Sequence, residues 1–278
     1  MMRARYLQPG SLPEALAALD GGGTILAGGT DFHPARDARA AAEDIIDITR
    51  IPELRRIEAG THAVRIGATV TWSDVAAASL PPAFDGLKAA AREVGGAQIQ
   101  NVGTVAGNLC NASPAADGVP ALLALDARVE LASRAGTRSI SLAQFLLGPR
   151  RTARAPDELV TAVIVPAWPP GARGSFLKLG HRRYLVISIA MVSAVVACDA
   201  TGRVTRAAVA VGACSAVARR LPALEARLPG MPGTAAPESV QASDLDVLAP
   251  IDDVRGTAEY RIEAARVLVR RALAQVVA

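Results

Sequence analysis

The sequence has few cysteines and few aromatic residues, and its cysteines form no cluster. Cys110, Cys198 and Cys214 are the 3 cysteines of the 278-residue chain, and they stand far apart with no Cys-x-x-Cys motif. Iron–sulfur clusters and structural zinc sites need several closely placed thiolates, so we expect neither in this chain. A small, odd number of cysteines also fits a reducing compartment better than a disulfide framework, and we therefore expect a cytoplasmic protein.

Long apolar runs and basic blocks are also missing. The longest apolar stretch, residues 185–198, is shorter than the roughly 20 residues that a membrane-spanning helix needs, and its serines and β-branched residues indicate a buried strand. The first residues lead straight into a helix cap at Ser11, so we expect no signal peptide. Because the net charge of +4 comes from scattered arginines and aromatics make up 3% of the chain, we do not expect nucleic-acid binding.

Catalysis by side chains has little support in the sequence. His33, His62 and His181 lie in separate contexts, and no serine stands in a nucleophile elbow. Since neither a hydrolytic nor a metal-binding pattern is present, we expect any chemistry to come from a bound cofactor.

Two segments combine small residues with amide and hydroxyl side chains. Residues 27–31 read Ala-Gly-Gly-Thr-Asp and follow a short apolar run, and residues 99–117 form a single predicted loop rich in glycine, alanine and asparagine. Small residues let backbone N–H groups approach an anion, and asparagine and threonine supply directed hydrogen bonds. Taken alone, each segment could be an ordinary tight turn or helix cap. The pair indicates two loops that grip one diphosphate.

Three separated motifs follow one another in the chain. Residues 27–31 come first, and Thr-Val-Ala-Gly-Asn at 104–108 comes second. The second motif runs on through Asn-Ala-Ser-Pro to Asp117, and residues 250–261 contain Asp-Val-Arg-Gly-Thr-Ala-Glu-Tyr-Arg. This combination resembles the FAD-binding subunits of the molybdenum hydroxylases, the family of xanthine dehydrogenase and carbon monoxide dehydrogenase. The resemblance covers nearly the whole chain.

One position departs from the family pattern. Where the family usually has a second glycine in its Thr-x-Gly-Gly-Asn loop, this chain has Ala106. If the backbone needs a positive φ there, the methyl group would cost on the order of 1 kcal/mol. Because alanine is the smallest alternative, we expect FAD binding to survive.

The resemblance implies which residues hold the FAD. The segment 27–31 would wrap the diphosphate, the segment 104–108 would oppose it, and Asp117 would accept hydrogen bonds from the hydroxyl-bearing chain of the cofactor. The implied cofactor-binding residues are Leu26, Ala27, Gly28, Gly29, Thr30, Asp31, Phe32, Val94, Thr104, Ala106, Gly107, Asn108, Asp117, Leu159, Val160 and Lys178. Two of them have structural alternatives, because Asp117 could cap the helix after Gly118 and Lys178 could face solvent on a strand edge.

Two further residues have both a structural and a functional interpretation. Cys110 could lie near the flavin, but we interpret it as a small buried thiol, and Cys198 and Cys214 as core residues. No catalytic side chain is predicted. By resemblance Tyr184 could cover one face of the isoalloxazine ring, and otherwise it would begin a strand and face solvent.

Periodicity and turn residues divide the chain into three parts with an α+β fold. We expect a small α/β lobe over residues 1–60, a second lobe of the FAD-binding domain over 61–168, and a C-terminal domain with an antiparallel sheet and helices over 172–278, after a hinge at 168–171. The resemblance identifies the two lobes as an FAD-binding domain of the molybdopterin dehydrogenase type. The predicted elements are helices beginning at Ser11 and Thr71, helices over 84–94, 215–228 and 257–276, and strands over 45–48, 54–57, 64–68, 175–179, 186–198 and 204–212.

The resemblance implies an electron-transfer subunit of a multi-subunit molybdenum hydroxylase. Its partners would be an iron–sulfur subunit and a molybdopterin-binding large subunit, because this chain has neither cysteine clusters nor a second large domain. The complex would oxidise an aldehyde, an N-heterocycle, a purine or carbon monoxide, and FAD would pass the electrons to NAD, a quinone or oxygen. The alternatives are a stand-alone flavin oxidase or reductase, for which His33 could tether the flavin, and a scaffold that has lost the cofactor.

Overall fold

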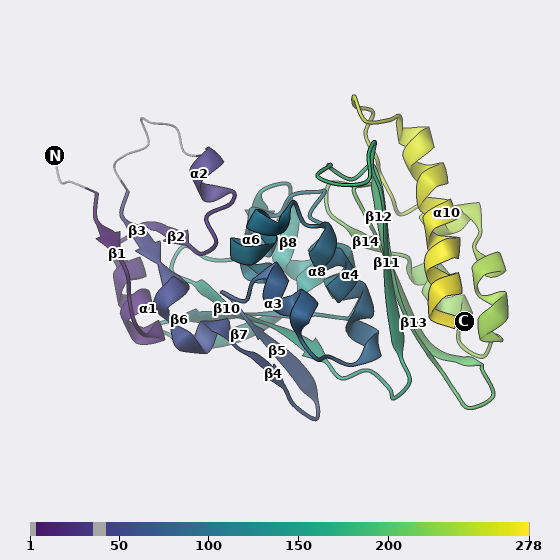
Figure 1. Cartoon of the computed structure of the whole chain (residues 1–278), viewed down its shortest axis with the longest axis horizontal. Coiled ribbons are helices and arrows are strands. Elements are labelled where there is room, and N and C mark those ends of the chain that lie inside the picture. The colour runs from purple at the N-terminus through teal and green to yellow at the C-terminus, as the bar shows by residue number, and fades with distance from the viewer. Residues whose placement is uncertain (1–3, 36–42, 278) are drawn as a thin grey trace.

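The chain folds into three parts that follow one another along the length of the molecule (Figure 1). A computed structural model describes residues 4–35 and 43–277. An N-terminal lobe comes first, then a central sheet with short helices over it, then a C-terminal sheet backed by a long helix. Helices and mainly antiparallel sheets are mixed in this way, which confirms the predicted α+β class.

The N-terminal lobe is a small parallel sheet with one helix beside it. Helix α1 (Leu12–Asp20) begins as predicted, because the Ser11 hydroxyl accepts the backbone N–H of Glu14. The strand β2 (Thr24–Leu26) leads directly into residues 27–31 and the short helix α2 (Phe32–Ala35). The sheet has the order β1-β3-β2, with β1 Tyr6–Leu7, β2 Thr24–Leu26 and β3 Ile45–Asp47.

The central part is a five-stranded antiparallel sheet, and Figure 1 shows the helices α3, α4, α6 and α8 on one side of it. Its strand order is β4-β5-β10-β6-β7, with β4 Ile57–Ala59, β5 Ala63–Gly67, β6 Arg128–Ser133, β7 Gly136–Ser141 and β10 Leu159–Pro166. The helices are α3 Trp72–Ala77, α4 Asp85–Glu93, α5 Ala97–Val102, α6 Val105–Asn111, α7 Gly118–Ala124 and α8 Leu142–Phe145. A hairpin of β8 (Leu146–Gly148) and β9 (Arg151–Thr152) completes this part.

The C-terminal part is a four-stranded antiparallel sheet with α10 packed against it (Figure 1). Its strands are β11 Arg173–Leu179, β12 Ala190–Cys198, β13 Val204–Gly212 and β14 Arg219–Arg220, and its helices are α9 Pro222–Arg227 and α10 Ala258–Val277. Short 3-10 turns lie at Ile48–Arg50, Pro52–Arg55, Pro82–Phe84, Gly233–Ala235, Pro237–Ser239 and Ala242–Leu245.

Strand β12 is buried on both faces, which explains why it reads as a continuous apolar run. Met191 and Val195 belong to the core of the central part, whereas Val192 and Val196 belong to the core beneath α10. Because successive side chains of a strand point to opposite faces, both cores are covered by one strand. Trp168, in the segment predicted as a hinge, donates its indole N–H to the Leu125 carbonyl at 3.3 Å. The shared core and this contact oppose free movement between the two parts.

Three sequence predictions of local structure are wrong. Residues 99–117 are mostly helical, in α5 and α6, because Val105 and Leu109 are buried at a helical spacing that the glycines and asparagines obscure. Residues 54–57 are not one strand, since Leu54 ends up fully buried in a 3-10 turn and β4 starts at Ile57. Residues 215–228 hold β14 and the short α9, whose first residue is Pro222, a residue that favours a helix start.

None of the helices within residues 4–35 and 43–277 combines the length and apolar character that crossing a bilayer requires.

Candidate cofactor site

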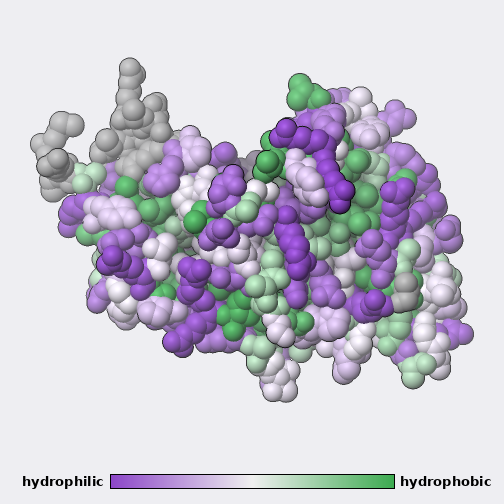
Figure 2. Space-filling view, viewed as in Figure 1, coloured by the Kyte–Doolittle hydropathy of each residue, from purple (hydrophilic) through white to green (hydrophobic). Residues whose placement is uncertain are grey.

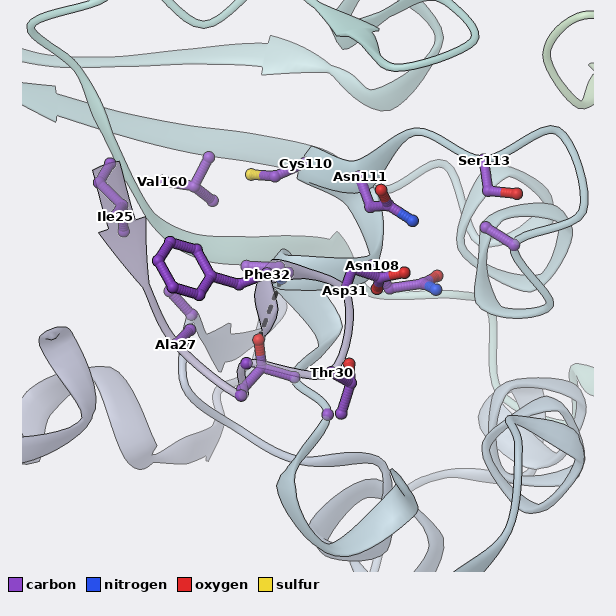
Figure 3. Close-up of a pocket in the computed structure, with 18 of the residues that line it drawn as sticks. Ile25, Ala27, Thr30, Asp31, Phe32, Asn108, Cys110, Asn111, Ser113 and Val160 are labelled. Carbon is purple, nitrogen blue, oxygen red and sulfur yellow. Dashed lines mark hydrogen bonds between the residues drawn. The ribbon is translucent and has the colours of Figure 1, made fainter. Parts of the chain in front are cut away.

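A large cavity opens where the N-terminal lobe meets the central part. Its volume is about 770 Å³, within the range of small-molecule and cofactor sites. The segment with Ala27, Thr30 and Phe32 forms one wall, and α6 with Asn108 and Cys110 lies across from it (Figure 3). The surface of the molecule is visibly hollowed between the N-terminal lobe and the C-terminal part (Figure 2).

The structure brings most of the predicted cofactor-binding residues to this cavity. Leu26 and Lys178 are the exceptions, because Leu26 is buried just behind the wall and Lys178 reaches it only through Asp117. The predicted residues that line the cavity are Ala27, Gly28, Gly29, Thr30, Asp31, Phe32, Val94, Thr104, Ala106, Gly107, Asn108, Asp117, Leu159 and Val160. Residues far apart in the sequence therefore share one binding space.

Gly28 is where the two predicted loops touch. A Cβ atom at this position would lie 2.1 Å from the backbone carbonyl oxygen of Val102 and 2.9 Å from the Cα of Gly103. No side chain fits in that space, so the contact requires glycine. The next residue, Gly29, has a φ of 73°, a left-handed conformation that also favours glycine. The close approach of the two segments thus follows directly from the Gly-Gly pair.

The second wall is fixed by backbone hydrogen bonds to the segment 70–72. The N–H of Trp72 donates to the Gly103 carbonyl at 3.1 Å, and the N–H of Val105 donates to the Val70 carbonyl at 3.0 Å. The Thr104 hydroxyl accepts the Gly107 N–H at 3.0 Å and so caps α6. These bonds hold the start of α6 in a defined place beside residues 27–31.

Ala106 causes no backbone strain. It lies within α6 and is 4% exposed, and it is not among the described residues with positive φ. The cost that a left-handed alanine would bring therefore does not arise. The family's glycine at this place is not needed for the backbone path that this chain adopts.

Asn108 presents an unmet hydrogen-bonding atom in the cavity wall. Its side-chain oxygen Oδ1 is buried and accepts no hydrogen bond within the described protein. Leaving a buried acceptor unpaired costs about 1–3 kcal/mol, so such atoms normally mark a place where a ligand or water completes the bond. The Asn108 amide is thus suited to receive a donor from a cofactor.

Asp117 is buried at the junction with the C-terminal part and does not cap a helix with its side chain. Its Oδ2 accepts from the Lys178 ammonium at 2.8 Å, and its Oδ1 accepts from the Ser188 hydroxyl at 2.8 Å. Burial raises the pKa of the Asp117 carboxyl above its ordinary value, while Lys178 and Ser188 act in the opposite direction. Lys178 and Ser188 therefore both favour the ionised Asp117 carboxylate, which is the form that accepts hydrogen bonds from the hydroxyl groups of a cofactor.

Several cavity residues were not found by sequence reasoning. Cys110 lines the cavity and is exposed there, so its interpretation as a small buried thiol is wrong. Desolvation of the thiolate by the surrounding residues raises the pKa of Cys110 to about 11. Cys214, in contrast, is buried in the core as expected, and Cys198 is partly buried against it. Further lining residues outside the predicted segments include Ile25, Ile48, Trp72, Arg150, Thr152 and Arg154.

The arginines at 150, 151 and 154 were the one feature of the sequence that could have indicated this side of the cavity.

Tyr184 and His33, the two residues interpreted from the sequence as possible flavin contacts, are not among the lining residues. Tyr184 is 62% exposed, and the Arg183 guanidinium lies 5.2 Å from its ring centroid. His33 is exposed in α2 and packs edge-on against Phe32, with the ring centroids 5.2 Å apart.

Comparison with known proteins identifies the family. Residues 2–168 match the FAD binding domain in molybdopterin dehydrogenase, and residues 175–276 match the CO dehydrogenase flavoprotein C-terminal domain. The chain belongs to the molybdopterin dehydrogenase flavoprotein family. Its members are oxidoreductases, and the cofactor of this family's matched domain is FAD.

Named relatives of this flavoprotein extend over nearly its full length. It is 33% identical to the nicotine 6-hydroxylase medium subunit of Paenarthrobacter nicotinovorans over 98% of this chain and 96% of the relative. It is 31% identical to the carbon monoxide dehydrogenase medium chain of Hydrogenophaga pseudoflava, over 98% and 96% of the two chains. A chain in the structure of reconstituted CO dehydrogenase from Oligotropha carboxidovorans matches it with a TM-score of 0.90 and 28% identity, over 100% of this chain and 99% of that one.

The cavity residues of this flavoprotein fit an FAD molecule. At Gly28 two backbone segments meet in the cavity wall with no side chain between them, an arrangement suited to an anion such as a diphosphate, and the Asn108 oxygen lacks a donor that a ligand could supply. Asp117 is suited to hydroxyl groups rather than phosphate, because a carboxylate accepts hydrogen bonds but repels another anion.

Proposed function

We propose that this flavoprotein is the electron-transfer subunit of a multi-subunit molybdenum hydroxylase. It takes electrons from iron–sulfur centres on a partner and delivers them to a terminal acceptor, which is NAD, a quinone or oxygen. The relatives named as a medium subunit and a medium chain support partners on separate polypeptides. The wide spacing of Cys110, Cys198 and Cys214 supports the same division of cofactors. The reducing conditions that suit these thiols favour a cytoplasmic complex.

Within this chain, the observation that best supports the proposal is the Asn108 side-chain oxygen, which lies in the cavity wall without a hydrogen-bond donor. In the proposed complex, residues 27–31 and 104–108 hold the diphosphate between them, and Asp117 accepts hydrogen bonds from the cofactor's hydroxyl groups. When bound, FAD accepts electrons singly and passes them on in pairs. The chain itself supplies binding, orientation and exclusion of water.

Reconstitution of the purified chain tests cofactor binding. Apo-protein titrated with FAD should bind one equivalent, with quenching of flavin fluorescence. Asn108→Leu should lose roughly tenfold or more in affinity, because it removes an acceptor at a buried site. A folded wild-type chain that takes up no FAD would contradict the proposal and favour the scaffold alternative.

Affinity purification from the native host tests the partners. The chain should be recovered with cysteine-rich companions that carry iron, sulfide and molybdenum. Recovery of a flavin-loaded chain that turns over alone, with no companion, would instead support the stand-alone oxidase or reductase. The acceptor can then be identified by supplying NAD, a quinone analogue or oxygen to the reduced complex.

The stand-alone alternative with a flavin tethered to His33 has no support from the cavity, because His33 is not one of its lining residues. Acid precipitation separates the two arrangements directly. Flavin held without a covalent bond is released into the supernatant, whereas tethered flavin stays with the pellet. We expect full release.

Tyr184 remains a proposed residue at the flavin face. Its exposed side chain and the neighbouring exposed Leu185 lie in a loop between β11 and β12, and Leu185 lies beside Gly96 in the central part. We expect Tyr184→Ala to change the flavin absorption spectrum or the rate of reoxidation with little change in FAD affinity. Unchanged values for both would discard this role.

A further inference from the structure

The hairpin of β8 and β9 brings an arginine to the cavity from a side that the two predicted loops do not cover. Arg150 lies at the turn of this hairpin and lines the cavity with an exposed side chain. Its φ of 55° is left-handed, a conformation that costs about 1–3 kcal/mol in residues other than glycine. Its backbone N–H donates to the Ala112 carbonyl at 3.1 Å, at the end of α6 opposite Thr104. The residue is therefore fixed at the backbone and held toward the cavity.

The neighbouring Arg154 also lines the cavity but is already engaged. One nitrogen of its guanidinium donates to the carbonyls of Ala155 and Glu158, at 3.0 Å and 2.7 Å. The Arg150 guanidinium, by comparison, has no hydrogen bond or ion pair with any of residues 4–35 and 43–277. Arg150 is thus the cavity arginine whose whole guanidinium is uncommitted within these residues, whereas Nη1 of Arg154 is engaged.

Neither carboxylate that lines the cavity among the described residues forms an ion pair with Arg150. Asp117, one of the two carboxylates that line the cavity, is committed to Lys178 and Ser188. The other, Asp31, forms no ion pair among the residues described. A guanidinium presents several N–H donors in a planar fork that matches the oxygens of a phosphoryl group. A nucleotide phosphate entering the cavity would meet this fork.

We propose that Arg150 binds a phosphoryl group of a nucleotide in this cavity. This inference rests on the proposed function, because the nucleotide is either the FAD itself, through its diphosphate, or a phosphate-bearing acceptor that approaches the bound flavin. In both cases the recognised chemistry is the same. Arg150 adds a charged contact to a site whose other phosphate contacts come from backbone N–H groups and neutral side chains.

Arg150→Gln and Arg151→Gln form a matched pair for the test. Arg151 carries the same charge on the adjacent residue and is also exposed, but it does not line the cavity. The apo forms of the wild type and both variants are titrated with FAD, ADP and adenosine. Arg150→Gln should weaken binding of FAD and ADP by about tenfold, which is the scale of one charge-assisted hydrogen bond, and leave adenosine unchanged. Arg151→Gln should leave all three unchanged.

A second titration distinguishes the source of the phosphate. If Arg150→Gln keeps wild-type affinity for FAD and ADP, the FAD-loaded protein is titrated with NAD⁺, and a roughly tenfold loss there assigns Arg150 to the acceptor. Equal affinities in every titration overturn the inference, as does an equal loss for ADP and adenosine. Failure of the wild type to bind FAD would be a failure of the proposed function instead, so the two results remain distinguishable.

Discussion

The cofactor-binding part and the C-terminal part hold their segments together by different means. In the C-terminal part, β11, β12 and β13 are seven to nine residues long and pair along nearly their whole length, and their side chains fill cores on both faces of the sheet. Around the cavity, short elements meet through backbone contacts such as that of Gly28 with Val102. The C-terminal part is therefore stabilised by buried side-chain volume, whereas the segments around the cavity can approach one another because side chains are absent where they meet.

The two parts meet at Asp117, which belongs to the cofactor-binding part and accepts hydrogen bonds from side chains of the C-terminal part. Lys178 at the end of β11 and Ser188 just before β12 supply its partners. The C-terminal part therefore contributes to the cofactor site without lining the cavity.

Gly28→Ala should have the largest effect. The added methyl carbon would lie 2.1 Å from the Val102 carbonyl oxygen, so the two cavity segments must separate. We expect FAD affinity to fall roughly 100-fold, equivalent to about 3 kcal/mol, the upper range for an overpacked site. Fluorescence titration measures the loss.

Gly148→Ala is the control for this change. A Cβ atom at Gly148 would meet nothing within 4 Å, and it is not among the glycines with positive φ. We expect its FAD affinity and thermal stability to equal those of the wild type. Wild-type binding by Gly28→Ala would show that the backbone contact is not required for the site.

Lys178→Met should have the next largest effect on binding, a loss of about tenfold in FAD affinity. Because it leaves the buried Asp117 carboxylate without its cation, it should also lower the free energy of unfolding by about 3–5 kcal/mol. The two side chains are 7% and 10% exposed. The pKa of Asp117 is already raised by burial and would rise further. Lys88→Met, which removes a lysine far from Asp117 in the chain, should show neither loss.

The pH dependence gives a second measurement on Lys178→Met. The pKa of Asp117 lies above its ordinary value of 3.8, so the folded state binds the proton more readily than the unfolded state does. As the pH rises above 3.8, the carboxylate must ionise inside the folded protein, and the free energy of unfolding falls. Removing the Lys178 cation makes this loss larger. The stability difference between wild type and variant should therefore be larger at pH 8 than at pH 4. A difference independent of pH would mean that lost packing, not the unpaired charge of the buried Asp117 carboxylate, causes the effect.

Asp126→Asn should separate junction stability from cofactor binding. Asp126 pairs with Arg206 and Arg220 of the C-terminal part, each at 2.6 Å, but these side chains are 25–39% exposed. Asparagine tolerates the left-handed φ of 57° at this position. We expect thermal unfolding to report a loss of at most about 1 kcal/mol and FAD titration to report no change. A large loss of affinity would show that the junction as a whole, rather than Asp117, controls the site.

Ala106→Gly should have the smallest effect. Glycine within α6 costs up to about 1 kcal/mol in helix stability relative to alanine, while the absence of a positive φ leaves no strain to relieve. We expect FAD affinity to stay within about threefold of the wild type. If affinity increased by orders of magnitude, the alanine would obstruct the cofactor in a way that the backbone does not reveal.

Part of the site could be predicted because its residues encode the contact directly. Gly28 is small because its backbone meets that of Val102, and Gly29 is glycine because its φ is left-handed, so the Gly-Gly pair marks both requirements in the sequence. The α+β class and the extent of β13 followed from alternation and turn residues in the same way. Local chemistry thus predicted the elements whose form depends on few distant contacts.

The remainder depends on contacts between distant segments. The helical form of residues 105–111 is stabilised by burial of Val105 and Leu109, which their polar and glycine-rich neighbours hide. Ser188 reaches Asp117 across 71 positions of the chain, and no local pattern marks a serine for that bond. Arg150 and Cys110 come to the cavity only because the hairpin and α6 pack together. Such residues become visible only when the fold is known.

The dependence of Asp117 on Lys178 and Ser188 sets an order of events during biosynthesis. These partners are translated 61 and 71 positions after the carboxylate that they bond. A nascent chain that has released only its first two lobes holds this acid without its counter-ion, so we expect its affinity for FAD to reach the full value only after residues 178–188 have emerged from the ribosome.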